Sequence, residues 1–235
     1  YSASAPVFDS NISAADALYL DFDGHSGTDA WGTYNAAAFD FNGTPSQFSP
    51  AEQLAIKNAW RTASEDYSPF ALNVTTAAPA TFGDGTAFRM VVTNTDSTII
   101  GQPSGNLGNS FVGSYAAGGT SNNVGFVFVE NFPLYNSGGA SGRIMARAAE
   151  QGSTVAHEFG HSLGLNHYQS QGGVGIGSVF PEGIMASPDL GLNREIWRTG
   201  TDEFGNAQDD MSVVSGVTNT FGYRADDHGN VPSTA

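Results

Sequence analysis

Runs of apolar residues and their spacing predict a chain that mixes strands with helices. The first strand is expected at residues 17–22, an apolar run with partial alternation. Four more strand candidates follow it, at 71–76, 88–93, 110–115 and 125–129. Between residues 24 and 48 we expect a stretch that is rich in turns.

The first helix has a well-marked start. Ser49 stands at the N-cap position, Pro50 at the first helical position and Glu52 three residues after the cap, which is the pattern of a capping box. Apolar residues then recur at spacings of four, three and four, at Ile56, Trp60, Ala63 and Tyr67. This spacing predicts one buried stripe, and Pro69 should end the helix.

A second, longer helix is expected from about residue 142 to residue 163. Val155, Phe159 and Leu163 lie four residues apart, so they share one face of this helix. That face should pack against the sheet.

The character of the chain changes after Gly164, where glycine, proline and polar residues dominate. One short helix is expected near 206–214, with Asn206 as its cap. We therefore expect a single domain (1–235), divided into an N-terminal subdomain (1–164) and an irregular C-terminal subdomain (165–235). A cleft between two such parts is the natural place for a binding site.

Composition narrows the choice of partners. The 235 residues carry a formal net charge of −15, which repels nucleic acid and anionic membrane surfaces. Thirty glycines indicate many tight turns, and the absence of cysteine excludes disulfides and thiolate metal ligands. The sequence has no apolar run of the roughly 18 residues that a membrane span requires.

The chemically informative segment is residues 157–167, which read HEFGHSLGLNH. His157 and His161 are four residues apart, so a helix presents both imidazoles on one face. Gly164 can adopt a left-handed conformation, end the helix and return the chain so that His167 reaches the same ion. Glu158 borders that face and is placed to contact a metal-bound water rather than the metal.

Three imidazoles and one open position are typical of a catalytic zinc site, because structural sites usually close with a fourth protein ligand. The alternative is that these are ordinary core or surface histidines. By chance, this pattern should arise with a probability on the order of 10⁻⁵ in a chain of this composition, which favours the metal site. Glu158 would then act as general base towards the zinc-bound water.

These residues resemble the signature of the metzincin clan, HExxHxxGxxH followed by a methionine-containing turn. Met185 lies 18 residues after His167 and is similar to the methionine of that turn. In the clan this side chain forms an apolar floor under the imidazoles. The segments LDFDGH (20–25), EDYSPF (65–70) and GYRADDHGN (222–230) resemble a family of bacterial secreted metallopeptidases.

The resemblance implies a metzincin-like α+β fold. It would have a twisted, five-stranded, mostly parallel sheet, a backing helix, an active-site helix and an irregular C-terminal part with a short helix. Residues 110–115 would form the antiparallel edge strand and pair with extended substrate. Residues 231–235 would suit the start of a linker.

Two positions depart from the patterns of the better-known relatives. Ser187 stands where some relatives carry a metal-reaching tyrosine, and Tyr168 stands where many carry an acidic residue. Residues 172–177 are rich in glycine and most simply form a loop.

Other potential ligands have ordinary explanations. His25 and His228 could bind a second metal, although a structural role is the simpler interpretation. Asp21, Asp23, Asp226 and Asp227 offer the oxygen ligands that calcium prefers, but no calcium site can be assigned.

The sequence therefore predicts a secreted, extracellular zinc endopeptidase, acting as a monomer on extended protein or peptide substrates. Two alternatives stay open: a zinc-retaining binding module without activity, and a zinc amidase that acts on cell-wall peptide.

Overall fold

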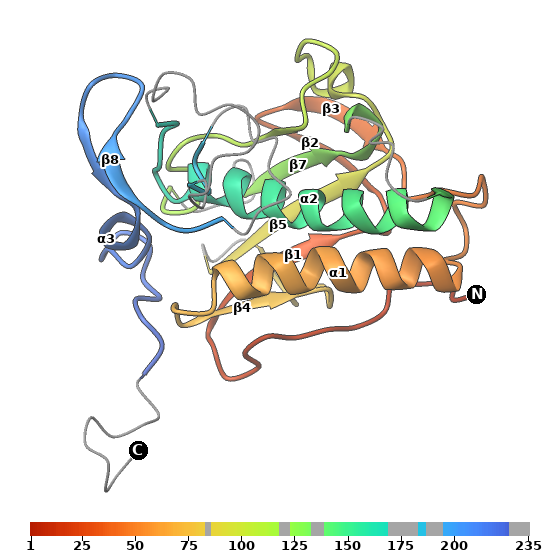
Figure 1. Cartoon of the computed structure of the whole chain (residues 1–235), viewed down its shortest axis with the longest axis horizontal. Helices are drawn as coiled ribbons and strands as arrows, with labels where there is room; N and C mark the ends of the chain where they lie inside the picture. Colours follow the sequence, from red (N-terminus) through yellow and green to blue (C-terminus); the bar gives the residue numbers. More distant parts are fainter. Residues whose placement is uncertain (83–85, 118–122, 133–138, 169–182, 187–194, 226–235) are drawn as a thin grey trace, which may run out of the picture.

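The computed structural model describes residues 1–82, 86–117, 123–132, 139–168, 183–186 and 195–225 of the chain. Within these ranges a central sheet carries two long helices on one face, and a small hairpin covers part of the other face (Figure 1). The described helices and strands thus mix as an α+β fold, as the sequence predicts.

The central sheet has five strands in the order β4-β1-β5-β7-β6. They are β1 (Asp16–Asp21), β4 (Leu72–Thr75), β5 (Ala87–Thr93), β6 (Gly108–Asn109) and β7 (Val124–Phe128). The first four in this order are parallel, and β6 pairs antiparallel with β7 at the edge. The expected five-stranded, mostly parallel sheet is confirmed.

Side chains alternate between the two faces of the sheet, as the pleat of a strand requires. In β5, Phe88, Met90 and Val92 belong to the core under the helices, whereas Val91 belongs to the cluster on the opposite face. Both faces of the central strands are therefore buried, which explains the nearly continuous apolar runs in the sequence.

Helix α1 (Pro50–Asp66) begins as the sequence predicts. The Ser49 hydroxyl accepts a hydrogen bond from the Glu52 amide at 3.3 Å, and the Glu52 carboxylate accepts one from the Ser49 amide at 2.7 Å. Ile56, Ala63 and Tyr67 are buried, so the predicted stripe faces the core.

Helix α2 (Gly139–Ser162) lies beside α1 on the same face of the sheet (Figure 1). The two helices approach closely at Gly152, where a Cβ atom would lie 2.5 Å from the carbonyl oxygen of Ala59. Val155, Phe159 and Leu163 are buried in the shared core, as expected. No helix in the described ranges is long and apolar enough to cross a membrane.

The expectation of turns between residues 24 and 48 is wrong in part. Strands β2 (His25–Asp29) and β3 (Gly32–Ala36) form an antiparallel hairpin there. Gly32 has a φ of 93° at the turn, a value that favours glycine, and Tyr34 and Ala36 point into the core while their neighbours are exposed. This short polar hairpin lacks the long apolar alternation that marked the other strands.

The predicted edge strand is also misplaced. Residues 108–109, rather than 110–115, pair with β7. Beyond them the backbone turns towards α2, and the amides of Gly113 and Tyr115 donate to the carbonyls of His161 and Ser162 at 2.9 and 3.0 Å. The end of the helix, and not the sheet, satisfies these amides.

In the C-terminal part, a second hairpin joins β8 (Thr199–Thr201) and β9 (Ala207–Asp209), and helix α3 (Asp210–Val214) follows directly. The expected start of this helix at Asn206 is wrong, because Asp209 is the N-cap and accepts from the Ser212 amide at 3.3 Å. The remaining described elements are two single-turn 3-10 helices, η1 (Ser97–Ile100) and η2 (Val129–Asn131).

Candidate metal centre

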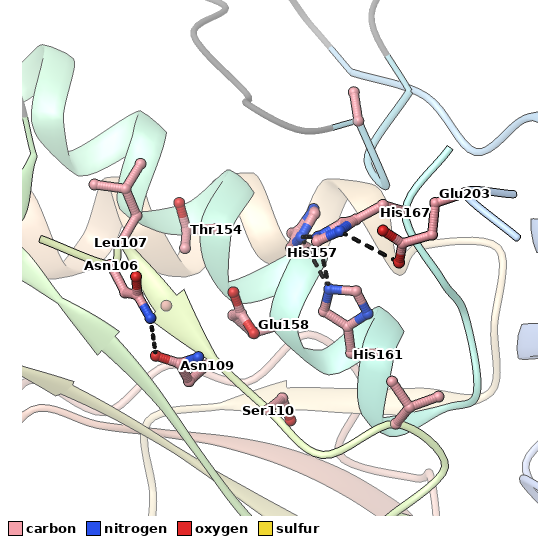
Figure 2. Close-up of a pocket in the computed structure, with 13 residues that line it drawn as sticks. Asn106, Leu107, Asn109, Ser110, Thr154, His157, Glu158, His161, His167 and Glu203 are labelled. Carbon is pink, nitrogen blue, oxygen red and sulfur yellow. Dashed lines mark hydrogen bonds and ion pairs between the residues drawn. The ribbon is translucent and has the colours of Figure 1, made fainter. Parts of the chain in front are cut away.

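The last turns of α2 position two of the three histidines. His157 and His161 are one helical turn apart and project from the same side of the helix (Figure 2). Each ring is held from behind, because Nδ1 of His157 lies 2.7 Å from the carbonyl oxygen of Ile184 and Nδ1 of His161 lies 2.8 Å from that of Leu165. A hydrogen on Nδ1 leaves the lone pair of Nε2 free for a metal.

Gly164 brings the third histidine to the same point. Its φ of 107° lies in the left-handed region, and its amide donates to the carbonyl of His161 at 2.8 Å. The next amide, of Leu165, donates to the carbonyl of Gly160 at 3.1 Å, which completes a Schellman cap. The helix thus ends at the predicted residue, and the chain turns back with His167.

The three Nε2 atoms form a nearly equilateral triangle. They lie 3.0 Å apart for His157 and His167, 3.1 Å for His157 and His161, and 3.1 Å for His161 and His167. Imidazoles bound to one tetrahedral zinc ion at about 2.05 Å would place their nitrogens about 3.3 Å apart. The carbonyls behind Nδ1 of His157 and His161 place the ring hydrogen on Nδ1, so each Nε2 carries a lone pair. These two lone pairs face one another, and a cation between them would stabilise that arrangement. The residues therefore fit a single zinc ion.

The environment keeps the helical imidazoles neutral. Burial, followed by the neighbouring His161, lowers the pKa of His157 to about 3. Burial also lowers the pKa of His161 to about 4. A neutral ring is the form that binds a metal, so these two side chains are ready to do so at neutral pH.

Glu158 faces the same cavity from α2, between Thr154 and the histidines (Figure 2). Its side chain is only 6% exposed, and burial raises the pKa of its carboxyl group to about 8. A nearby dication would oppose this shift, because an opposite charge favours the carboxylate. Gly108 of β6 lies against it, since a Cβ atom there would be 2.6 Å from Oε1 of Glu158.

The histidines and Glu158 line an open pocket of about 570 Å³. One wall is β6 with its flanking residues, and the other is α2 with the chain beyond it. The remaining lining residues are Asn106, Leu107, Gly108, Asn109, Ser110, Val112, Thr154, Ala186 and Glu203. A cavity of this size, beside a strand that pairs on one side only within the described residues, can hold part of an extended chain.

The turn at residues 183–186 lies directly beneath the imidazoles. Met185 is fully buried, and its sulfur would be 2.6 Å from a Cβ atom built on Gly160, so the thioether packs against the bare helix backbone. The preceding carbonyl, of Ile184, is the acceptor behind His157. The turn that sequence resemblance picked out therefore contacts the histidine cluster.

The other candidate ligands in the part of the chain that the structure describes do not join this centre. Half-buried His25 packs beside Tyr34 in the β2–β3 hairpin, and it belongs to no cluster of three or more possible ligands in the described ranges. Asp21 pairs with Arg89, and Asp23 accepts from the Ala5 amide at 3.1 Å. Several other predictions lie outside the described residues; they concern Ser187, Asp226, Asp227, His228, residues 172–177 and residues 231–235.

Sequence reasoning missed two residues that touch the site. At Gly108 there is no room for a side chain, because Glu158 lies too close. Oε1 of Glu203 lies 3.6 Å from Nδ1 of His167 (Figure 2). Neither Gly108 nor Glu203 belongs to a sequence motif that would identify it as part of the site. Gly108 is one of 30 glycines, and Glu203 lies 36 positions beyond the third histidine, so only the tertiary fold reveals their places.

A five-stranded mixed sheet, a helix with two histidines, a glycine turn to the third and a methionine beneath them fit a zinc peptidase of the metzincin type. A family model described as Metallo-peptidase family M12B Reprolysin-like matches residues 56–168, from within α1 to just beyond His167. No curated protein matches the chain in a sequence search. The family match and the histidine cluster agree, and together they fit a metzincin zinc metallopeptidase.

Proposed function

We propose that the protein is a secreted zinc endopeptidase that cleaves internal bonds of extended polypeptides. In this proposal His157, His161 and His167 hold the ion, and Glu158 is the general base. The observation that carries it is the triangle of Nε2 atoms, 3.0–3.1 Å apart, on the same pocket wall as a buried glutamate.

A zinc ion held by His157, His161 and His167 would supply a Lewis acid, which makes water a better nucleophile near neutral pH and polarises a substrate carbonyl. Glu158 would take a proton from the attacking water and deliver it to the leaving amine. The placement of Glu158 supports both roles, because its carboxylate faces the pocket and is shielded from bulk solvent. Gly108 lies against that carboxylate on the opposite wall and leaves no room there for a side chain of its own.

Strand β6 supports binding of an extended substrate. In the described part of the sheet it pairs with β7 on one side only, so its outer edge is free. Asn109 and Ser110 line the pocket beside Glu158. A substrate segment added to this edge as a further strand would place a peptide carbonyl near the histidines.

The decisive assay uses peptides that are acetylated at the N-terminus and amidated at the C-terminus. An endopeptidase cleaves them internally, whereas an exopeptidase needs a free end. We expect mass spectrometry to show internal cuts by the zinc-loaded protein, and activity should disappear with a chelator. A library of cell-wall peptides, assayed in parallel, tests the alternative that the protein is a zinc amidase acting on cell-wall peptide.

Two variants separate the roles at the site. Glu158→Gln should keep zinc but lose about 10²–10⁴-fold in kcat, because only the base is removed. His167→Ala should lose zinc itself. Full activity of Glu158→Gln, or the absence of hydrolysis from wild-type protein with one bound zinc, would refute the endopeptidase proposal.

Secretion and a monomeric state are part of the same proposal. The sequence segments shared with bacterial secreted metallopeptidases support secretion, and the net charge of −15 favours a soluble, separate chain. Recovery of the natural protein from culture medium tests secretion, and light scattering tests the monomer.

A further inference from the structure

Each imidazole of the centre has an oxygen atom near its Nδ1 atom. Backbone carbonyls lie within hydrogen-bond distance of His157 and His161, at 2.7 and 2.8 Å. For His167 the nearby oxygen belongs to a carboxylate, because Oε1 of Glu203 lies 3.6 Å from its Nδ1 (Figure 2). This separation exceeds a hydrogen bond, so the attraction is electrostatic at the observed distance. Glu203 thus occupies, for the third histidine, the place that carbonyls occupy for the others.

The backbone also joins Glu203 to the third histidine. The Glu203 amide donates to the His167 carbonyl at 2.8 Å. Glu203 stands in the turn between β8 and β9, and Asp202 organises that turn by accepting from the amides of Phe204 and Asn206 at 3.0 and 2.7 Å. The carboxylate therefore extends from a fixed point beside His167.

The residues on either side of His167 are bonded to the same hairpin. The Asn166 amide donates to Gln208 Oε1 at 2.9 Å, and the Asn166 side chain donates to Asp202 at 3.1 Å. On the other side, Tyr168 forms a β-bridge with Asp202, and its ring packs against Gly200, where a Cβ atom would lie 3.0 Å away. The hairpin thus holds the segment 166–168 from both ends.

His167 needs this support more than the helical histidines do. Its side chain is 31% exposed, and it lies beyond the end of α2, so no helix restrains it. The carboxylate of Glu203 reaches His167 from the β8–β9 hairpin.

We propose that Glu203 is a positioning residue that orients His167 and holds its hydrogen on Nδ1, so that Nε2 is free for zinc. Glu203 acts through the histidine and not on the substrate. The inference rests on the proposed function in one respect, namely that the three histidines bind the catalytic zinc.

The test measures zinc affinity by competition with a chromophoric chelator, for wild type, Glu203→Ala, Glu203→Gln and Phe204→Ala. Phe204 is the matched control, because it lies in the same turn and is 71% exposed. We expect Glu203→Ala to bind zinc about 10-fold more weakly, since loss of such a partner typically costs 10–100-fold. Glu203→Gln should fall between, because its amide oxygen keeps a partial negative charge near Nδ1 of His167 but loses the full charge of the carboxylate. Phe204→Ala should match wild type.

A spectroscopic measurement separates positioning from a general structural effect. Nitrogen-15 spectra of the zinc-free proteins at pH 8 report which ring nitrogen of each histidine carries hydrogen. We expect the Nε2–H form of His167 to grow in Glu203→Ala, while His157 and His161 stay unchanged. Unaltered zinc affinity in Glu203→Ala, or an unaltered His167 tautomer, would overturn the positioning role.

The two proposals fail in distinguishable ways. If wild-type protein binds no zinc, or keeps zinc after His167→Ala, the proposed metal centre is wrong and the role of Glu203 is wrong with it. If wild type binds zinc and hydrolyses peptides while Glu203→Ala binds zinc equally well, only the positioning role is refuted.

Discussion

Replacement of Gly108 by alanine should impair catalysis far more than stability. The new Cβ would lie 2.5 Å from Cγ and 2.6 Å from Oε1 of Glu158. Ordinary contacts are about 3.5–4.0 Å, so atoms must separate by about 1 Å. The backbone of β6 is fixed by its pairing with β7, whereas the Glu158 side chain can rotate. We therefore expect the carboxylate, rather than the strand, to move.

The magnitude follows from this displacement. A misplacement of about 1 Å at a reacting group can cost about 10²-fold in rate, which is about 2.7 kcal/mol of transition-state stabilisation. A rotated side chain costs only about 0.5–1.5 kcal/mol in stability. The assay is kcat/KM on a quenched fluorescent peptide, with zinc content and the urea midpoint measured on the same samples.

A double-mutant cycle with Glu158→Ala makes the test specific. Gly108→Ala should have almost no further effect in that background, because the group it displaces is already gone. Unchanged activity of the single variant would refute the reasoning. An equal loss in both backgrounds would also refute it, because the effect would then not pass through Glu158.

Three further substitutions test the packing around the site. Gly152→Ala should lower the free energy of unfolding by about 1–3 kcal/mol in urea titrations, because its Cβ would meet the Ala59 carbonyl at 2.5 Å, and the backbone of α1 yields less readily than a side chain. Met185→Ala should cost about 2–5 kcal/mol, whereas the volume-conserving Met185→Leu should cost under about 1.5 kcal/mol. Arg89→Met should cost about 3–5 kcal/mol at pH 7, because it leaves Asp21, 2% exposed, without its cation. Burial already raises the pKa of Asp21 above its usual 3.8, and loss of Arg89 should raise it further. The free energy of unfolding of Arg89→Met should therefore return towards that of wild type as pH falls through this raised pKa. A difference in unfolding free energy that grew in acid would contradict the prediction.

Short-range signals in the sequence were enough to predict the helices that carry the site. The capping box at Ser49 and the apolar spacing in both long helices depend on residues within one or two turns, and the structure confirms them. The helix end at Gly164 is equally local, since a left-handed glycine two residues past the helix determines where the chain turns. Local geometry thus places two histidines and the direction towards the third.

Pairing between distant segments is where sequence reasoning failed. Residues 110–115 contain apolar residues as a strand does, but the amides of Gly113 and Tyr115 bond to the end of α2, a partner that no periodicity reveals. The hairpin of β2 and β3 was not predicted because its outward residues are short and polar and because its fully buried residues are only Tyr34 and Ala36. In both cases the tertiary partner, and not the intrinsic preference of the segment, decides the structure.

The metal centre also combines groups placed by local sequence with groups placed by distant segments, and this combination links folding to zinc binding. Helix α2 and the turn at Gly164 position the three Nε2 atoms, but the acceptor behind His157 comes from the 183–186 turn and the carboxylate nearest His167 comes from the β8–β9 hairpin. Zinc therefore selects the arrangement in which these later segments are docked. A ligand that binds only the folded form stabilises that form, by about 4.1 kcal/mol when its free concentration is 1,000 times Kd. The zinc ion should therefore stabilise the C-terminal part as much as it stabilises α2, the helix that carries most of its ligands. Without disulfides to hold those segments, the acceptors behind the imidazoles connect the affinity for zinc to the integrity of the fold.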